Sequence, residues 1–278
     1  MNTPTEYLSA KFSLETEIAV VTGGAGVLPS TMATVLARAG ARVAIWGRGT
    51  NHPVQDAADT LIAENDLDAS RIAAITVDTA SEDAVASAWE ETVAALGEPT
   101  ILVNGVGGNR GKSDFVDIDV TTFEDVLSLN LLAGLVIPLK LFARRWIDAG
   151  RGGTVINLAS MTSYVPLSGV WAYNAAKSAV LNLTEGAARE FAPHGIRVNG
   201  IAPGFFLGYQ NRALLIANDE TGELTPRGQA IIDRTPFGRF GKLDDIEGAT
   251  LFLASPAASG FITGVTLPVD GGYLVNSI

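Results

Sequence analysis

The feature that most constrains the fold is a repeated alternation of short β-branched runs with helical stretches. Residues 18–21 are followed by a glycine-rich turn and by a helical pattern that continues to Ala39. The apolar run at 42–46 ends at Gly47-Arg48, and a second helical pattern spans residues 53–66. Further strand patterns cover residues 72–77, 101–104, 154–157, 197–201 and 265–269. This alternation predicts a doubly wound parallel sheet with helices on both faces and right-handed crossovers.

The 278 residues suit one α/β domain spanning residues 1–278, because alternating architectures of this length commonly fold as one unit. Such sheets bind ligands beyond the carboxyl ends of their strands, where the strand order reverses. We therefore expect the chemistry at residues that directly follow strands. Residues 205–240 interrupt the alternation with a polar stretch punctuated by glycine and proline, which predicts a substrate loop or lid.

Charge and composition exclude several classes of partner. A formal net charge of -11 would repel nucleic acid and anionic membrane surfaces. The chain has no cysteine and two histidines, His52 and His194, so we expect no disulfide, no metal centre and a cytoplasmic location. The most apolar stretch, residues 126–143, includes Pro138 and Lys140, which favours a buried or interface helix over a membrane span.

A glycine-rich turn, Thr22-Gly23-Gly24-Ala25-Gly26, follows the first strand. Glycine lets the backbone approach a pyrophosphate, and the N-terminus of the following helix favours negative charge. A tight turn without a ligand explains the same residues equally well. This run alone therefore leaves the choice open.

Tyr173 and Lys177 lie four residues apart in a helical pattern and share one helix face. A nearby ammonium favours the phenolate, which brings the tyrosine pKa towards neutral pH and suits the side chain for proton transfer. Alone, the pair is better explained by an amphipathic helix with a solvated cation. Ser160, which by itself would be a cap or turn serine, follows the strand at 154–157 and can hydrogen-bond a substrate oxygen. The joint pattern favours an active site.

Taken in order, these motifs resemble those of the short-chain dehydrogenase/reductase family over residues 18–272. Residues 22–24 are similar to the family's glycine-rich start, residues 104–107 to its Asn-Asn-Ala-Gly segment, and residues 199–204 to the segment that flanks the nicotinamide. The resemblance implies a Rossmann-type fold, an NADP or NAD cofactor, and a homotetramer or homodimer. Its subunit interfaces would use the helices that carry Asn130 and Tyr173.

The family's catalytic tetrad is matched residue by residue, by Asn130, Ser160, Tyr173 and Lys177. The resemblance implies that the tyrosine transfers a proton to or from the substrate oxygen, while the serine stabilises that oxygen. It implies that the lysine lowers the tyrosine pKa and binds the ribose, and that the asparagine supports a water-linked proton path.

The resemblance also implies a set of residues along the dinucleotide. They are Thr22, Gly23, Gly24, Gly26, Val27, Leu28, Gly47, Arg48, Asp78, Thr79, Asn104, Gly105, Val106, Tyr173, Lys177, Pro203, Gly204 and Phe206. NAD-preferring relatives usually place an acid at the end of the second strand, where this chain has Gly47 followed by Arg48. We therefore expect a preference for NADP, because a 2′-phosphate would meet less repulsion and gain a cationic partner.

Three positions depart from the family pattern along the cofactor. Val27 and Pro29 stand where the family has its second and third motif glycines, and Gly208 stands where a threonine commonly contacts the carboxamide. Proline is acceptable in the first turn of a helix. We expect a reshaped glycine turn and one hydrogen bond fewer at the nicotinamide.

A narrower resemblance, carried by residues 22–28, 104–109, 203–215 and 265–277, points to the sugar-acid branch that includes D-mannonate oxidoreductase and fructuronate reductase. An aldonate needs a cation, and an arginine can donate two parallel hydrogen bonds to a carboxylate. The candidate substrate-binding residues are Asn109, Arg110, Ser160 and Arg212, with Lys112, Arg227 and Arg234 nearby in the sequence or its loop.

The sequence therefore predicts an NAD(P)-dependent oxidoreductase that interconverts a hydroxyl and a keto group on a sugar acid or polyol, with Tyr173 as general acid and base. Two alternatives remain open at this stage. One is a reductase of 3-ketoacyl thioesters or simple ketones in the same family. The other is a catalytically inactive nucleotide sensor or scaffold, which the three departures along the cofactor would suit.

Overall fold

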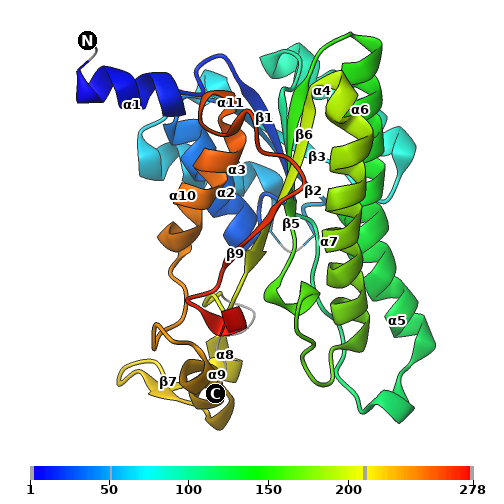
Figure 1. Ribbon diagram of the computed structural model, residues 1–278, viewed down its shortest axis with the longest axis vertical. Helices are drawn as coiled ribbons and strands as arrows, with labels where there is room; N and C mark the ends of the chain where they lie inside the picture. The colour runs from blue at the N-terminus through cyan, green and yellow to red at the C-terminus, as the bar shows by residue number, and fades with distance from the viewer. Residues whose placement is uncertain (1–2, 51, 209–211, 276–278) are drawn as a thin grey trace.

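The computed structural model describes residues 3–50, 52–208 and 212–275, and its centre is a seven-stranded parallel sheet (Figure 1). The strands lie in the order β3-β2-β1-β4-β5-β6-β9. Their bounds are β1 (Ile18–Thr22), β2 (Arg42–Gly47), β3 (Ile72–Thr76), β4 (Ile101–Asn104), β5 (Gly153–Leu158), β6 (Ile196–Pro203) and β9 (Thr266–Val269). The predicted doubly wound, Rossmann-type sheet in a single domain is confirmed, and each predicted strand run is present with ends shifted by at most two residues.

Helices cover both faces of the sheet (Figure 1). One layer consists of α4 (Glu82–Leu96), α6 (Ile137–Asp148) and α7 (Trp171–Phe191), and the other of α2 (Val27–Arg38), α3 (Val54–Asn65) and α10 (Glu247–Ala254). Central strands such as β1 are buried at every residue, which is why they are continuous apolar runs without alternation. An aromatic cluster of Trp46, Phe142 and Trp146 packs edge to face in the α4–α6–α7 layer.

The apolar stretch at 126–143 belongs to one long helix. It runs through α5 (Val120–Leu127), the π-helical η3 (Ser128–Val136) and α6. Within the described part of the chain, this helix is the one candidate long and apolar enough to cross a membrane, and half of its apolar window is buried inside the fold. A helix in the core of a folded domain is buried in this way, and the polar residues in the stretch predicted a buried or interface helix.

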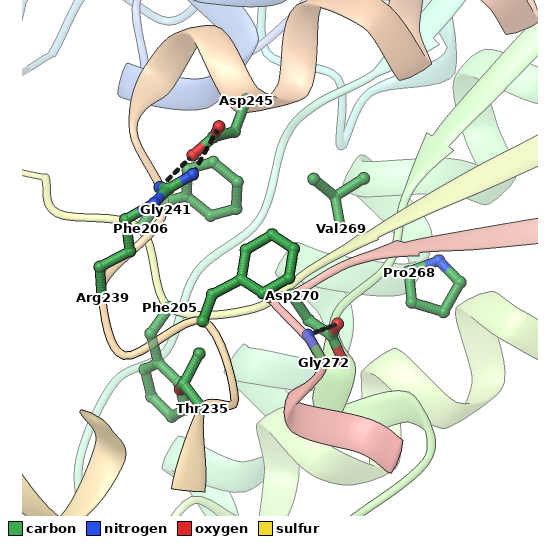
Figure 2. Close-up of a pocket in the computed structure, with 12 residues that line it drawn as sticks. Phe205, Phe206, Thr235, Arg239, Gly241, Asp245, Pro268, Val269, Asp270 and Gly272 are labelled. Atoms are coloured by element: carbon green, nitrogen blue, oxygen red, sulfur yellow. Dashed lines mark hydrogen bonds and ion pairs between the residues drawn. The ribbon is translucent and has the colours of Figure 1, made fainter. Parts of the chain in front are cut away.

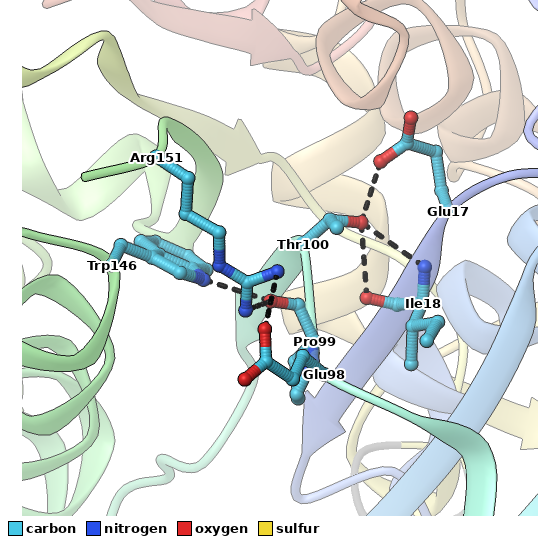
Figure 3. A network of polar contacts seen from close by, with 7 residues as sticks. All are labelled: Glu17, Ile18, Glu98, Pro99, Thr100, Trp146 and Arg151. Carbon is cyan, nitrogen blue, oxygen red and sulfur yellow. Dashed lines mark hydrogen bonds and ion pairs between the residues drawn. The ribbon is translucent and has the colours of Figure 1, made fainter. Parts of the chain in front are cut away.

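A network of hydrogen bonds joins the amino ends of β1 and β4 to each other and to α6 (Figure 3). The Thr100 hydroxyl accepts a hydrogen bond from Ile18 N at 3.0 Å and donates to the Glu17 carboxylate. Pro99 O accepts from the Trp146 indole at 2.8 Å and from Arg151 at 3.2 Å. The end of the sheet opposite the expected ligand site is thereby tied together.

The segment predicted as a substrate loop has secondary structure of its own. It contains α8 (Arg212–Leu215), the antiparallel strands β7 (Ile216–Asn218) and β8 (Glu223–Leu224), and α9 (Pro226–Arg234). Residues 209–211 lie outside the described residues. The sequence did not predict α9 because its buried residues are only Gly228 and Ile231, which is too few to give a helical apolar pattern. Its role as a substrate loop stays a prediction.

An N-terminal helix, α1 (Pro4–Phe12), was also not anticipated, although its start signal is present in the sequence. The Thr3 hydroxyl accepts from Glu6 N, and the Glu6 carboxylate accepts from Thr3 N, which is a complete capping box. The remaining short elements are η1 (Ala69–Arg71), η2 (Phe115–Asp117), η4 (Met161–Ser163), η5 (Ala192–His194), η6 (Leu243–Ile246), α11 (Pro256–Ser259) and η7 (Tyr273–Val275).

Candidate active site

A cleft of about 740 Å³ lies at the carboxyl ends of the strands. The strand order reverses between β1 and β4, which both belong to the centre of the sheet. Helices that follow β1 and β4 leave in opposite directions there, so the two strand ends open a crevice. The cleft is lined from residue 23 to residue 208, and its size falls within the range of ligand sites of about 300 to 1,000 Å³.

The turn after β1 packs against the loop after β4. The Thr22 hydroxyl accepts a hydrogen bond from Gly105 N at 3.0 Å, so the two strand ends are joined directly. Gly23, with a φ of +65°, approaches the Gly105 carbonyl so closely that a Cβ there would lie 3.0 Å from it. These contacts make a bare backbone cradle at the start of α2, and a pyrophosphate fits such a surface because backbone N–H groups and the helix N-terminus favour negative charge.

Two of the departures from the family pattern lie in contact with glycines. A Cβ on Gly105 would lie 2.8 Å from Pro29 Cγ and 2.5 Å from Thr22 O. A Cβ on Gly208 would lie 3.5 Å from Val27 Cγ2, which is ordinary contact. The proline ring is therefore accommodated because position 105 has no side chain, and the glycine turn keeps a compact form without its third motif glycine.

Most residues predicted to bind the cofactor line the cleft. The lining ones are Gly23, Gly26, Val27, Leu28, Gly47, Arg48, Asp78, Thr79, Gly105, Val106, Tyr173, Lys177, Pro203, Gly204 and Phe206. Three others are not among the lining residues and have structural contacts instead: Thr22 bonds Gly105, Gly24 packs against Ile45, and Asn104 donates to Asn157. Fifteen of the eighteen residues predicted along the cofactor thus line one cleft.

Helix α7 places Tyr173 and Lys177 on the cleft, as their spacing predicts. Lys177 is almost fully buried, and its ammonium donates to Leu158 O at 2.7 Å and lies 5.6 Å from the centre of the Tyr173 ring. Ser160 follows β5 and also lines the cleft, with its hydroxyl accepting from Thr162 N at 3.1 Å and hydrogen-bonded to Tyr173. All three side chains line the same cleft.

The expected lowering of the Tyr173 pKa by Lys177 is wrong in this structure. Burial raises the pKa of Tyr173 above its ordinary value of 10.0, and the hydrogen bond from Ser160 offsets only part of this rise. Burial also lowers the pKa of Lys177 to about 8. The ammonium donates to the Leu158 carbonyl, and the phenol, with a pKa above 10.0, stays protonated at neutral pH and has a proton to donate.

Asn130 lies in the π-helical segment η3, directly behind the cleft. Its amide donates to Gly108 O at 2.7 Å and to Val126 O at 2.8 Å, and its Oδ1 accepts from Gly108 N at 3.1 Å. A Cβ on Gly107 would lie 2.7 Å from Asn130 Oδ1 and 3.2 Å from Lys177 Nζ. Asn130 thus holds the loop after β4, and Gly107 keeps the space between the amide and the ammonium open.

The candidate substrate-binding residues separate into two groups. Asn109 and Arg110 line the cleft. Arg212 is not among the lining residues, and its guanidinium forms an ion pair with Asp219 at 2.8 Å. The structure therefore brings Arg110, and not Arg212, to the cleft with Ser160.

His52, which was not predicted as a site residue, also lines the cleft beside Gly47 and Arg48. Its position in the sequence could have indicated this, because His52 lies in the loop between β2 and α3, five residues after Gly47, where the choice between NAD and NADP was expected to be made. An imidazole there adds a second donor near the position expected for a 2′-phosphate.

A second cavity of about 350 Å³ adjoins the cleft (Figure 2). Phe205 and Phe206 line both spaces. At its edge Arg239 and Asp245 form an ion pair at 2.6 Å, and the hydrogen bond from Arg239 lowers the pKa of Asp245 to about 2. Phe205 and Phe206, which follow β6, thus separate the cleft from the second cavity.

A parallel α/β sheet with a glycine-lined cleft and a Ser-Tyr-Lys cluster at its switch point defines a dinucleotide-dependent oxidoreductase. A family model described as enoyl-(acyl carrier protein) reductase matches residues 28–274. The chain belongs to the short-chain dehydrogenase/reductase family. It is therefore an enzyme that uses NAD(P), as the resemblance implied.

Relatives of known sequence cover nearly the whole chain. An uncharacterized oxidoreductase, UxuB of Bacillus subtilis (strain 168), is 38% identical over 280 residues, which span 95% of this chain and 97% of that protein. The 2-dehydro-3-deoxy-D-gluconate 5-dehydrogenase of Dickeya dadantii (strain 3937) is 35% identical over 263 residues, covering 95% of this chain and 97% of the relative.

Solved structures agree with this. A gluconate 5-dehydrogenase from Burkholderia cenocepacia J2315 in complex with NADP and tartrate has a TM-score of 0.84 and 32% identity, covering 97% of this chain and 100% of that one. A Haemophilus influenza structure described as a D-mannonate oxidoreductase, with bound NAD, has the same TM-score and 32% identity, covering 97% and 99%. The predicted similarity to a sugar-acid branch is confirmed.

Replacing Gly105 by alanine should damage the cradle. The added methyl would lie 2.5 Å from Thr22 O and 2.8 Å from Pro29 Cγ, so the backbone must shift. We expect overpacking to cost about 1 to 3 kcal/mol of unfolding free energy. Urea denaturation measures the stability. Gly208→Ala is the matched control, because its methyl meets Val27 at an ordinary 3.5 Å; equal losses in the two variants would contradict the packing argument.

The charge of Lys177 should make cofactor binding depend on pH. Its pKa of about 8 means that the ammonium is present below that pH and is lost as the pH rises through it. We expect the dissociation constant for NADP(H), measured by fluorescence titration, to rise about threefold or more between about pH 7 and pH 9. Lys177→Met should flatten this profile, and an unchanged slope in that variant would exclude Lys177 as its source.

Proposed function

We propose that this chain interconverts a hydroxyl and a keto group on a sugar acid, with Tyr173 as the proton-transfer residue. The observation that carries the proposal is the convergence of Ser160, Tyr173 and Lys177 on a cleft shaped for a dinucleotide. The names of the relatives, which include gluconate and 2-dehydro-3-deoxy-D-gluconate 5-dehydrogenases, support the substrate class. The cysteine-free, acidic sequence supports our further proposal of a cytoplasmic location.

The bound nicotinamide would supply or accept the hydride at the substrate carbon. In reduction, Tyr173 donates its phenolic proton to the carbonyl oxygen, and the product is the alcohol. The raised pKa of Tyr173 keeps this proton in place at neutral pH. Ser160 accepts from Thr162 N, which leaves its hydroxyl hydrogen directed towards the phenol or a substrate oxygen. In oxidation the same proton moves back from the substrate hydroxyl to the phenolate.

Lys177 and Asn130 have supporting roles in this proposal. The buried ammonium holds the end of β5 through Leu158 O and has donors left for ribose hydroxyls. The space at Gly107 between Asn130 and Lys177 suits a water that returns a proton to Tyr173. These assignments follow the family tetrad position by position.

Arg110 is the residue we propose for the substrate carboxylate. It lines the cleft together with Asn109, whereas the ion pair with Asp219 already occupies Arg212. A guanidinium can bind a carboxylate through two parallel hydrogen bonds. The tartrate held by the gluconate 5-dehydrogenase structure is a dicarboxylate, which is consistent with an acid-binding site in that relative.

A second candidate is reduction of a 3-ketoacyl thioester or simple ketone, and the match to a family model described as enoyl-(acyl carrier protein) reductase supports a thioester substrate. Turnover of a panel of aldonates, polyols and acetoacetyl thioesters with both cofactors, followed at the nicotinamide absorbance, separates the two. A sugar acid should give the highest kcat/KM. A thioester as the best substrate would replace the proposed function.

Tyr173→Phe should abolish proton transfer while keeping the ring in place. We expect kcat to fall by about 10² to 10⁴. The dissociation constant for the cofactor should stay within about twofold, because the hydroxyl is directed at Ser160 and the substrate position. Stopped assays and fluorescence titration measure the two quantities. Turnover like that of the unmodified enzyme would remove Tyr173 from the mechanism.

The cofactor preference should depend on Arg48. We propose that Arg48, with His52 beside it, binds the 2′-phosphate of NADP. Arg48→Ala should raise KM for NADP(H) about tenfold, equivalent to about 1.4 kcal/mol, and leave KM for NAD(H) nearly unchanged. Initial rates with both cofactors give the answer. A lower KM for NAD(H) in the unmodified enzyme would reverse the assignment.

A further inference from the structure

The segment that carries Arg110 is held between two anchors. At its start, Asn130 bonds both backbone groups of Gly108, at 3.1 Å to the N–H and at 2.7 Å to the carbonyl. At its end, the Trp171 indole donates to Ser113 O at 3.0 Å. Only residues 109–112 lie between the anchors, and within them the Asn109 amide donates to Gly111 O at 3.0 Å. A tether this short leaves the backbone of Arg110 little freedom.

The second anchor consists of several contacts with Trp171 and the residues before it. Ser113 N donates to Gly169 O at 3.3 Å. The aliphatic stem of Lys112 packs on Gly169, where a Cβ would lie 2.7 Å from Lys112 Cγ. The Phe115 ring meets the Trp171 ring edge to face, with centroids 5.3 Å apart. Without the indole, one backbone hydrogen bond and the Lys112 packing would remain.

Trp171 is the first residue of α7, and Tyr173 follows two residues later on the same rigid helix. We propose that Trp171 is a positioning residue that keeps the Arg110 segment in register with Tyr173. It contacts neither of these two side chains in the interactions above. It acts through the backbone of Ser113 and so sets where the cationic end of the cleft lies relative to the proton-transfer end.

This register has a consequence for specificity, which rests on the proposed function. A sugar acid carries several hydroxyls at different distances from its carboxylate. If Arg110 binds the carboxylate, then the separation between Arg110 and Tyr173 selects the carbon that reacts. Reacting atoms must be placed within a fraction of an ångström for efficient chemistry. Trp171 would therefore select among positions on one substrate.

The first test probes the anchor without any substrate. Trypsin cleaves after Arg110 and Lys112 when the segment opens locally. We expect Trp171→Ala to speed cleavage at these two bonds about tenfold or more, and Trp171→Phe, which keeps the ring but loses the donor, to have an intermediate effect. Cleavage after Arg227, which lies in α9, is the control and should not change. Mass spectrometry of the fragments identifies each bond.

The second test separates positioning from general destabilisation. We expect Trp171→Ala to raise KM for the best aldonate about tenfold, to lower kcat for that aldonate as well because the reacting carbon loses its register with Tyr173, and to leave KM and kcat for the matching uncharged polyol within about twofold. Trp171→Phe should restore part of the lost affinity. In a background that already carries Arg110→Gln, Trp171→Ala should have little further effect on the aldonate, because coupled residues give non-additive changes.

The outcomes distinguish the two proposals. Unchanged cleavage at both bonds, or equal losses for the acid and the polyol, would overturn the role of Trp171. If Arg110→Gln leaves KM for aldonates unchanged, the carboxylate assignment in the proposed function fails, and faster cleavage in Trp171→Ala still supports the positioning role.

Discussion

The close approach of two backbone turns at the centre of the sheet is the constraint on which the rest of the site depends. The strand order reverses between β1 and β4, so the turn after β1 and the loop after β4 meet directly. Thr22 bonds Gly105 across this junction, and Gly23 lies against the Gly105 carbonyl. A side chain at either glycine would separate the two turns. The cofactor cleft depends on this contact, in which neither Gly23 nor Gly105 contributes a side chain.

The same junction explains how the chain tolerates departures from its family's glycine motif. Pro29 supplies a ring where the family has no side chain, and Gly105 has no side chain where the family has an asparagine. In this chain the side chain that fills the contact is therefore at position 29, and not at position 105. Pro29 alone would crowd the loop after β4. Together with Gly105, it keeps the close packing of the two turns that cofactor binding requires. This packing accounts for Pro29, one of the three departures that suggested an inactive nucleotide sensor.

Burial controls the acid-base groups more strongly than their mutual charge. Lys177 sits almost fully buried beneath the end of β5, and its pKa falls to about 8. Tyr173 is shifted in the opposite direction, because burial disfavours the charged form of either group. The two shifts move the pKa values apart, because they start at 10.0 and 10.5 and end above 10.0 and at about 8, and they leave a neutral phenol beside an ammonium at neutral pH. A neutral phenol has a proton that it can donate to a substrate carbonyl oxygen.

The sequence by itself predicted the seven strands of the central sheet, helices between most of them and most of the residues that line the cleft, because these depend on local patterns: apolar runs, a glycine turn, and a spacing of one helical turn between Tyr173 and Lys177. The predicted tetrad came from the family resemblance, and α1, α8, β7, β8 and α9 were not predicted. The sequence did not determine the pKa of Tyr173, the engagement of Arg212 by Asp219, or the anchoring of the Arg110 segment by Trp171. Only the tertiary structure decided these. Burial and contact between distant segments are properties of the packed chain, and no window of sequence contains the atoms that create them.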